Sequence, residues 1–185
     1  FALEVELWRI GDSALAPKFN VVSKPNEWTR SVVDSTKNTE VSQLRWRYWS
    51  EFIKQPALKP ILASPQQPNR QGNLNLNTRW HDFKLSVFFN RTDKRIGVYI
   101  MCRGEDGGEN FRQLLTEREA IEKKLGPGLV WDDGDTKGWV TRRFPKNDAV
   151  QESDWPRQHK LLASAAVDFY NAFDPYMQEL DSTGD

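Results

Sequence analysis

The recurrence of an apolar residue at every second position along two neighbouring segments constrains this chain more than any other feature. Apolar side chains occupy every second position in residues 80–89 and again in residues 95–102. Successive side chains of a strand point to opposite faces, so each segment predicts a strand with one buried face. The polar run 90–94 between them predicts an antiparallel hairpin. The predicted buried face consists of Phe83, Leu85, Val87, Phe89, Ile96, Val98, Ile100 and Cys102.

Three segments carry apolar residues at the spacing of amphipathic helices. The first covers residues 39–54 and ends before Pro56, and the second covers residues 109–125 and ends at Gly126-Pro127. Ser153-Asp154 is a capping signal for the third, because such side chains accept hydrogen bonds from the first free backbone N–H groups of a helix. The expected buried positions are Val41, Leu44, Tyr48 and Phe52; Phe111, Leu114, Leu115, Ile121 and Leu125; and Leu162, Ala166, Phe169 and Phe173.

A second pair of strands is predicted at residues 129–131 and 139–144, joined by the acidic turn 132–135. We therefore expect an α+β fold with a mainly antiparallel four-stranded sheet and helices packed on one face, in the order α-ββ-α-ββ-α. A long polar connection, residues 55–78, precedes the first hairpin. Connections of that length are uncommon in compact domains and are either mobile or functional loops.

The N-terminal part has a different character. Residues 1–10 alternate like a strand, and a second short strand is predicted at 18–22. Residues 23–38 are rich in Ser, Thr, Asn and Lys, which predicts a linker. Because the sequence also starts at a phenylalanine, we expect residues 1–35 to be the terminal strands and linker of an upstream domain. Residues 36–185 would then form the α+β domain.

Composition narrows the class of protein. Lys and Arg number 26, and so do Asp and Glu, which excludes a uniformly basic nucleic-acid coat protein. Aromatic residues make up 12% of the chain, a share that disordered chains do not reach. The single cysteine, Cys102, excludes an internal disulfide and a multi-cysteine metal site. No run of about 18 apolar residues occurs. We therefore expect a cytoplasmic protein without a membrane segment.

The balanced charge is segregated along the chain. Residues 79–103 and 136–147 each carry four more basic than acidic residues, whereas residues 104–135 carry five more acidic ones. Basic strands could follow a phosphate backbone, and Trp46 between two arginines suits base stacking. The alternatives are a buried Trp46 and ion pairs between basic strands and acidic helices. The predicted nucleic-acid-binding residues are Arg45, Trp46, Arg47, Arg79, Arg91, Lys94, Arg95, Arg142, Arg143 and Lys146.

The sequence predicts neither a catalytic nor a metal site in this chain. The Gly-rich segment 104–109 lies where phosphate loops occur, but it lacks their spacing and carries carboxylates that suit a helix start. The acidic turn 132–135 lacks the complete calcium-loop pattern. Cys102 occupies one of the alternate strand positions that are expected to be buried. His81 and His159 are expected at the surface or in hydrogen bonds.

Several motifs resemble one prokaryotic family. They are ELWRIGDS at 6–13, APKFNVV at 16–22 and KPN-x-W at 24–28, followed by YW-x-x-F at 48–52, RI-x-V-x-I at 95–100, F-x-x-L at 111–114, IE at 121–122, LG at 125–126, L-x-W at 129–131 and Trp155. With these residues the chain resembles the family called domain of unknown function 4268. In that family the domain follows a restriction-nuclease-like domain.

The resemblance implies that residues 1–30 end such a nuclease-like domain. Its Mg²⁺ site would lie upstream, because no lysine stands two positions after Glu4 or Glu6, as a nuclease motif of this type requires. The implied function is a non-catalytic accessory domain of a nucleic-acid-associated protein, in defence against foreign DNA. Its partners would be nucleic acid and its own upstream domain. The alternative is a protein-interaction module or homodimer without nucleic-acid contact, since Trp and Arg are favoured at interfaces.

Overall fold

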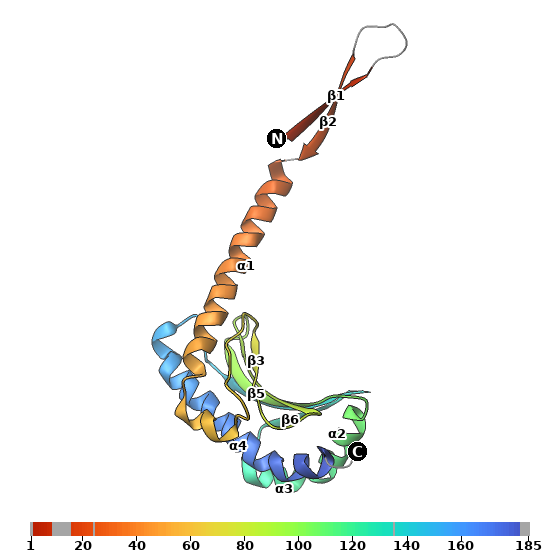
Figure 1. Cartoon of the computed structure of the whole chain (residues 1–185). Helices are drawn as coiled ribbons and strands as arrows, with labels where there is room; N and C mark the ends of the chain where they lie inside the picture. The colour runs from red at the N-terminus through yellow and green to blue at the C-terminus, as the bar shows by residue number, and fades with distance from the viewer. Residues whose placement is uncertain (1, 9–15, 24, 135, 182–185) are drawn as a thin grey trace. The chain divides into compact units, whose positions relative to one another are not determined.

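The computed structural model describes residues 2–8, 16–23, 25–134 and 136–181. The chain divides into two compact units, 1–43 and 44–185. Each unit is considered by itself below, and the larger one holds the α+β domain (Figure 1). Within the described residues, no helix combines the length and the apolar character needed to cross a lipid bilayer.

The smaller unit contains an antiparallel strand pair. Strand β1 (Ala2–Trp8) pairs with β2 (Ala16–Ser23), with Glu6 opposite Lys18. Both predicted strands are therefore confirmed, whereas the turn expected at Gly11 lies outside the described residues.

Helix α1 (Pro25–Phe52) corrects the linker predicted for residues 23–38. Ser, Thr and Asn are only moderately poor helix formers, and after Pro25 neither proline nor glycine interrupts the segment. Pro25 itself occupies the first helical position, where its missing N–H costs nothing. A polar composition was therefore a weak reason to expect a linker.

The sheet of the larger unit has five strands in the order β3-β4-β5-β7-β6, and every neighbouring pair is antiparallel. This confirms the predicted α+β class and antiparallel sheet, but it corrects the number of strands from four to five. The additional strand and a short 3₁₀ helix, η1 (Pro56–Ile61), both come from the predicted connection 55–78. The strands are β3 (Asn73–Asn75), β4 (Phe83–Asn90), β5 (Arg95–Cys102), β6 (Leu129–Asp133) and β7 (Gly138–Pro145).

Helices cover one face of this sheet (Figure 1). Helices α4 (Trp155–Asp181) and α2 (Gly107–Thr116) contact the strands, and α3 (Arg118–Leu125) packs against α4. The single helix predicted for 109–125 is therefore two helices, separated at Glu117. A short 3₁₀ helix, η2 (Glu152–Asp154), precedes α4. The residues predicted to be buried in the first hairpin and in the last helix are all buried.

The other face of the sheet, called the outer face below, carries the alternate side chains of each strand. Gly97 in β5 lies opposite Phe88 in β4 and opposite Arg143 in β7. A Cβ atom at Gly97 would come closer than 3.0 Å to the Phe88 ring and to the carbonyl oxygen of Arg142. Glycine here therefore allows the Phe88 ring to lie flat against the backbone of β5.

We predict that Gly97→Ala destabilises the domain by about 1–3 kcal/mol, because the added methyl group overpacks this contact. Gly72→Ala is the matched control, since its Cβ would meet neighbouring atoms only at an ordinary 3.6 Å. Urea unfolding monitored by tryptophan fluorescence measures both variants. Equal free energies of unfolding for the two variants would contradict the packing seen at Gly97.

Candidate nucleic-acid interface

Three aromatic rings lie on the outer face, one from each central strand. Phe88 in β4, Tyr99 in β5 and Trp139 in β7 are each half-buried. The ring centroids of Phe88 and Tyr99 are 6.0 Å apart, and Trp139 lies opposite Met101, two residues beyond Tyr99 along β5. A shallow hollow of about 360 Å³ opens among these rings, and we call it the outer-face hollow. Its lining residues are Phe88, Asn90, Arg95, Tyr99, Trp139, Thr141 and Arg143.

Two predicted arginines line the hollow. Nη2 of Arg95 lies 2.7 Å from Oδ2 of Asp93, whereas its Nε is buried without a hydrogen-bond partner. Arg143 is exposed and makes no ion pair within the part of the chain that the structure describes. Both guanidinium groups line the hollow and carry hydrogen-bond donors. Cationic donors of this kind suit an anion such as a phosphate.

Three more predicted residues belong to the end of the sheet at which Arg95 lies. Arg91 and Lys94 belong to the β4–β5 turn, and Lys146 follows β7 directly. Lys94 and Lys146 both have positive φ angles, 47° and 60°, as tight turns require. Nζ of Lys94 is 3.5 Å from Oδ2 of Asp148. The structure therefore brings five of the ten predicted residues to this end of the sheet: Arg91, Lys94, Arg95, Arg143 and Lys146.

The structure does not bring Arg142 or Arg79 to the hollow. Arg142 points to the helix side, where its Nη2 donates to Gly126 O at 2.9 Å and its guanidinium lies 5.9 Å from the Phe169 ring centroid. Neighbouring strand residues face opposite ways, so Arg142 and Arg143 cannot share one flat ligand. Arg79 lies near the other end of β4 and pairs with Asp174 of α4.

The Arg45-Trp46-Arg47 run lies on α1. Trp46 is 45% exposed in this chain, and its burial by a neighbouring domain stays a prediction. Nη2 of Arg47 lies 2.7 Å from Oε1 of Glu152, and Cζ of Arg47 lies 5.9 Å from the Trp155 ring centroid. The charge of Arg47 is therefore already paired. Nε of Arg45 is buried without a partner, and its guanidinium is near Gly72.

Of the expected ion pairs between basic strand segments and helices, the described residues show the pair of Arg79 with Asp174 of α4. Glu109 and Glu122 pair with Arg112 and Arg118 of their own helices. Lys94, in the β4–β5 turn, pairs with Asp148, and Arg95, in β5, pairs with Asp93. Both acids lie outside the helices. Acidic helices therefore do not neutralise the outer face.

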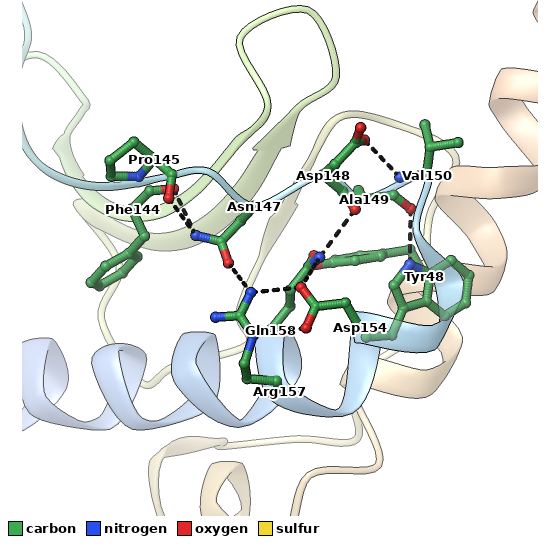
Figure 2. Close-up of polar contacts among 11 residues, drawn as sticks. Tyr48, Phe144, Pro145, Asn147, Asp148, Ala149, Val150, Asp154, Arg157 and Gln158 are labelled. Atoms are coloured by element: carbon green, nitrogen blue, oxygen red, sulfur yellow. Dashed lines mark hydrogen bonds and ion pairs between the residues drawn. The ribbon is translucent and has the colours of Figure 1, made fainter.

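A buried hydrogen-bond network joins α1, the segment after β7 and the start of α4 (Figure 2). The Tyr48 hydroxyl donates to Gln158 Oε1 at 3.0 Å, and Gln158 Nε2 donates to Asp148 O at 3.1 Å and to Asp154 Oδ2 at 3.0 Å. Arg157 Nη2 donates to Asn147 Oδ1 at 2.7 Å. The Tyr48 hydroxyl and both ends of the Gln158 amide have partners, which indicates a structural clamp rather than a site that awaits a ligand.

The pKa values of this clamp agree with a structural role. Hydrogen bonds from Arg157 and Gln158 lower the pKa of Asp154 to about 2. Burial raises the pKa of Tyr48 far above its ordinary value. Neither group exchanges a proton near neutral pH, so neither is suited to acid–base catalysis.

The two histidines and the cysteine do not form a site. His159 is 2% exposed, and its ring lies 4.4 Å from Tyr48 and 5.9 Å from Phe52 and Trp155. Burial raises the pKa of the Cys102 thiol to about 12, whereas His81 is exposed. Within the described residues, no group of three or more His, Cys, Asp or Glu could hold a metal ion.

Sequence reasoning missed the three aromatic residues of the hollow. The signal was available, because assigning Phe89 and Val87 to the buried face of β4 places Phe88 on the opposite face. The same alternation places Tyr99 and Trp139 on the outer face beside Arg95 and Arg143.

Comparison with known proteins identifies one family. The sequence model described as "Domain of unknown function (DUF4268)" matches residues 44–177. No curated protein and no solved structure matches the chain. The matched range covers all five strands of the sheet and most of α4.

We predict that His159 makes the stability of the domain fall as the pH decreases from about 6.5 to about 4. Burial lowers the pKa of His159 from 6.5 to about 4, so over this range the unfolded chain binds a proton that the folded chain does not. The free energy of unfolding should decrease by up to about 3 kcal/mol across the range.

Urea unfolding at a series of pH values measures this loss. His159→Phe should flatten the profile. A profile unchanged in His159→Phe would overturn the assignment.

Proposed function

Because the chain belongs to the family described as Domain of unknown function (DUF4268), a description that names no activity, we propose its function from the outer-face hollow. The domain binds single-stranded nucleic acid and does not itself catalyse a reaction. The observation that carries this proposal is that Phe88, Tyr99 and Trp139 line one hollow together with Arg95 and Arg143. Proteins that bind single strands combine aromatic rings for the bases with a basic path for the backbone.

The geometry favours single strands over a duplex. In a duplex each base face is covered by the neighbouring bases, so a base can stack on these rings only when it is splayed out of a helix or belongs to a single strand. Stacking contributes about 1–3 kcal/mol per base and tolerates any base. The exposed Arg143 would receive a phosphate, and Arg91, Lys94 and Lys146 are further exposed basic residues at the same end of the sheet.

We propose further that this binding assists a restriction-nuclease-like domain on the N-terminal side, in a prokaryotic cytoplasm and in defence against foreign DNA. The support is the resemblance carried by residues 6–28. An accessory domain that holds a single strand would raise the local concentration of substrate at such a nuclease. Mg²⁺ chemistry would belong to that domain.

A second candidate function is a protein-interaction module or homodimer. It is favoured by Trp46, which is 45% exposed on α1 next to Arg45 and Arg47. Exposed Trp and Arg are frequent energetic centres of protein interfaces. Light scattering over a wide concentration range tests the homodimer: it should find a dimer that Trp46→Ala converts to a monomer. A wild-type protein that stays monomeric throughout would remove this form of the candidate.

We predict that Arg143→Gln and Tyr99→Leu each weaken binding to a labelled 12-nucleotide single strand, measured by fluorescence anisotropy. Loss of stacking in Tyr99→Leu should raise Kd at least roughly 5-fold. Arg143→Gln removes one phosphate contact, so the slope of log K against log salt should become shallower by about 0.7.

Arg112→Gln is the matched control, because Arg112 is also exposed but lies on α2 and pairs with Glu109. It should leave the affinity unchanged. If the wild-type chain shows no salt-sensitive binding to single-stranded DNA or RNA, or if Arg112→Gln weakens binding as much as Arg143→Gln, the proposal is wrong.

A further inference from the structure

We infer that Asn73, on the edge strand β3, is a positioning residue that holds the Tyr99 ring in place for stacking at the outer-face hollow. The inference rests on the proposed nucleic-acid function and adds to it a residue from outside the hollow. Tyr99 lines the hollow, whereas Asn73 does not. The effect of Asn73 on a bound base would therefore pass through the Tyr99 ring.

The side chain of Tyr99 extends across strand β4. Tyr99 belongs to β5, on one side of β4, and Asn73 belongs to β3, on the other side. Nδ2 of Asn73 donates to the Tyr99 hydroxyl at 3.2 Å. Neighbouring strands are about 4.8 Å apart, so the two side chains together bridge roughly two strand spacings. The Tyr99 ring therefore lies over β4, and because Tyr99 is only half-buried, part of the ring stays open to solvent.

The burial of Ser86 agrees with this placement of the ring. Ser86 lies directly opposite Tyr99 in the register of β4 and β5, and alternation places it on the outer face. It is nevertheless 0% exposed, whereas the other outer-face residues of β4, Lys84, Phe88 and Asn90, are half-buried. The Tyr99 ring accounts for the difference, because it covers Ser86, and the small serine side chain leaves room for it.

Phe88 is held by packing alone, in the opposite direction. Its ring lies against Gly97 of β5, as described above, so each ring of the pair rests on a small residue of the neighbouring strand. The planes of the Phe88 and Tyr99 rings differ by 44°. Only Tyr99 adds a hydrogen bond to this packing, so a phenylalanine at position 99 would keep the ring and lose the tether to Asn73.

Asn73 is itself fixed by the sheet and by the preceding loop. Its backbone oxygen accepts from Nδ2 of Asn69 at 3.0 Å, and its own Nδ2 group lies 3.4 Å from Oδ1 of Asn75. The next residue, Leu74, is 2% exposed and anchors β3 in the core. A ring restrained by a fixed donor loses less conformational entropy when a base stacks on it, and this strengthens binding.

The test measures the affinity of the full chain for the labelled 12-nucleotide single strand by fluorescence anisotropy. Asn73→Leu removes the donor but keeps the size of the side chain, and it should raise Kd roughly 2- to 10-fold, the range that one neutral hydrogen bond predicts. Tyr99→Phe should raise Kd by a similar factor, and the double variant should bind no more weakly than either single variant. The salt dependence of Asn73→Leu should stay that of the wild type, because no phosphate contact is lost.

Gln66→Ala is the matched control, because Gln66 also supports β3, donating from Nε2 to Asn75 O at 3.1 Å, but is not the residue that tethers Tyr99. It should lower the free energy of unfolding and leave Kd unchanged. The positioning role is overturned, while the proposed function stands, by any of three results: Asn73→Leu binds like the wild type, Gln66→Ala weakens binding as much as Asn73→Leu, or the effects of Asn73→Leu and Tyr99→Phe multiply in the double variant. If the wild type binds no single strand, the proposed function itself fails, and this inference fails with it.

Discussion

Burial of one face of the five-stranded sheet against α4 and α2 is the constraint on which the rest of the domain depends. In β5, Ile96, Val98 and Ile100 are fully buried, and each such side chain contributes roughly 1.5–3 kcal/mol when removed from water. Shifting this strand by one residue would expose them and bury Arg95 and Tyr99. The core therefore fixes the outer face as well: the register that buries the isoleucines also sets the aromatic rings beside the arginines.

The buried clamp of Figure 2 extends this control to the basic end of the sheet. Asn147 donates from its side chain to Phe144 O and Pro145 O, and its backbone N–H donates to Lys94 O at 2.8 Å. One asparagine thus ties the end of β7 to the β4–β5 turn. The ion pair of Arg95 with Asp93 and the positive φ of Lys94 occur at this end of the sheet.

The sequence predicted the strands and the helix whose apolar residues recur at the spacing of the side that the structure buries. The strands β4 and β5 and the buried side of α4 carried strong periodicity, and the structure has them. Strand β3 was missed because three residues in an Asn-rich segment give little signal, although NLNLN alternates and places Leu74 and Leu76 inward. The break at Glu117 had no Gly or Pro to mark it. The basic charge of the strand segments indicated Arg95 and Arg143 as candidate binding residues. Only the pairing between distant strands shows that Arg142 faces the helices, where it donates to a backbone carbonyl.

A net charge of zero is compatible with a nucleic-acid interface because charges act over a limited distance. At physiological ionic strength the field of an exposed charge is screened within about 8 Å. The acids of α2 and α3 lie on the helix side, where Glu109 and Glu122 are neutralised by arginines of their own helices. A phosphate that approaches the outer face would interact with Arg143. The net charge of the whole chain would have little effect on this contact. Total charge therefore governs solubility here, whereas the strand register governs where an anion can bind.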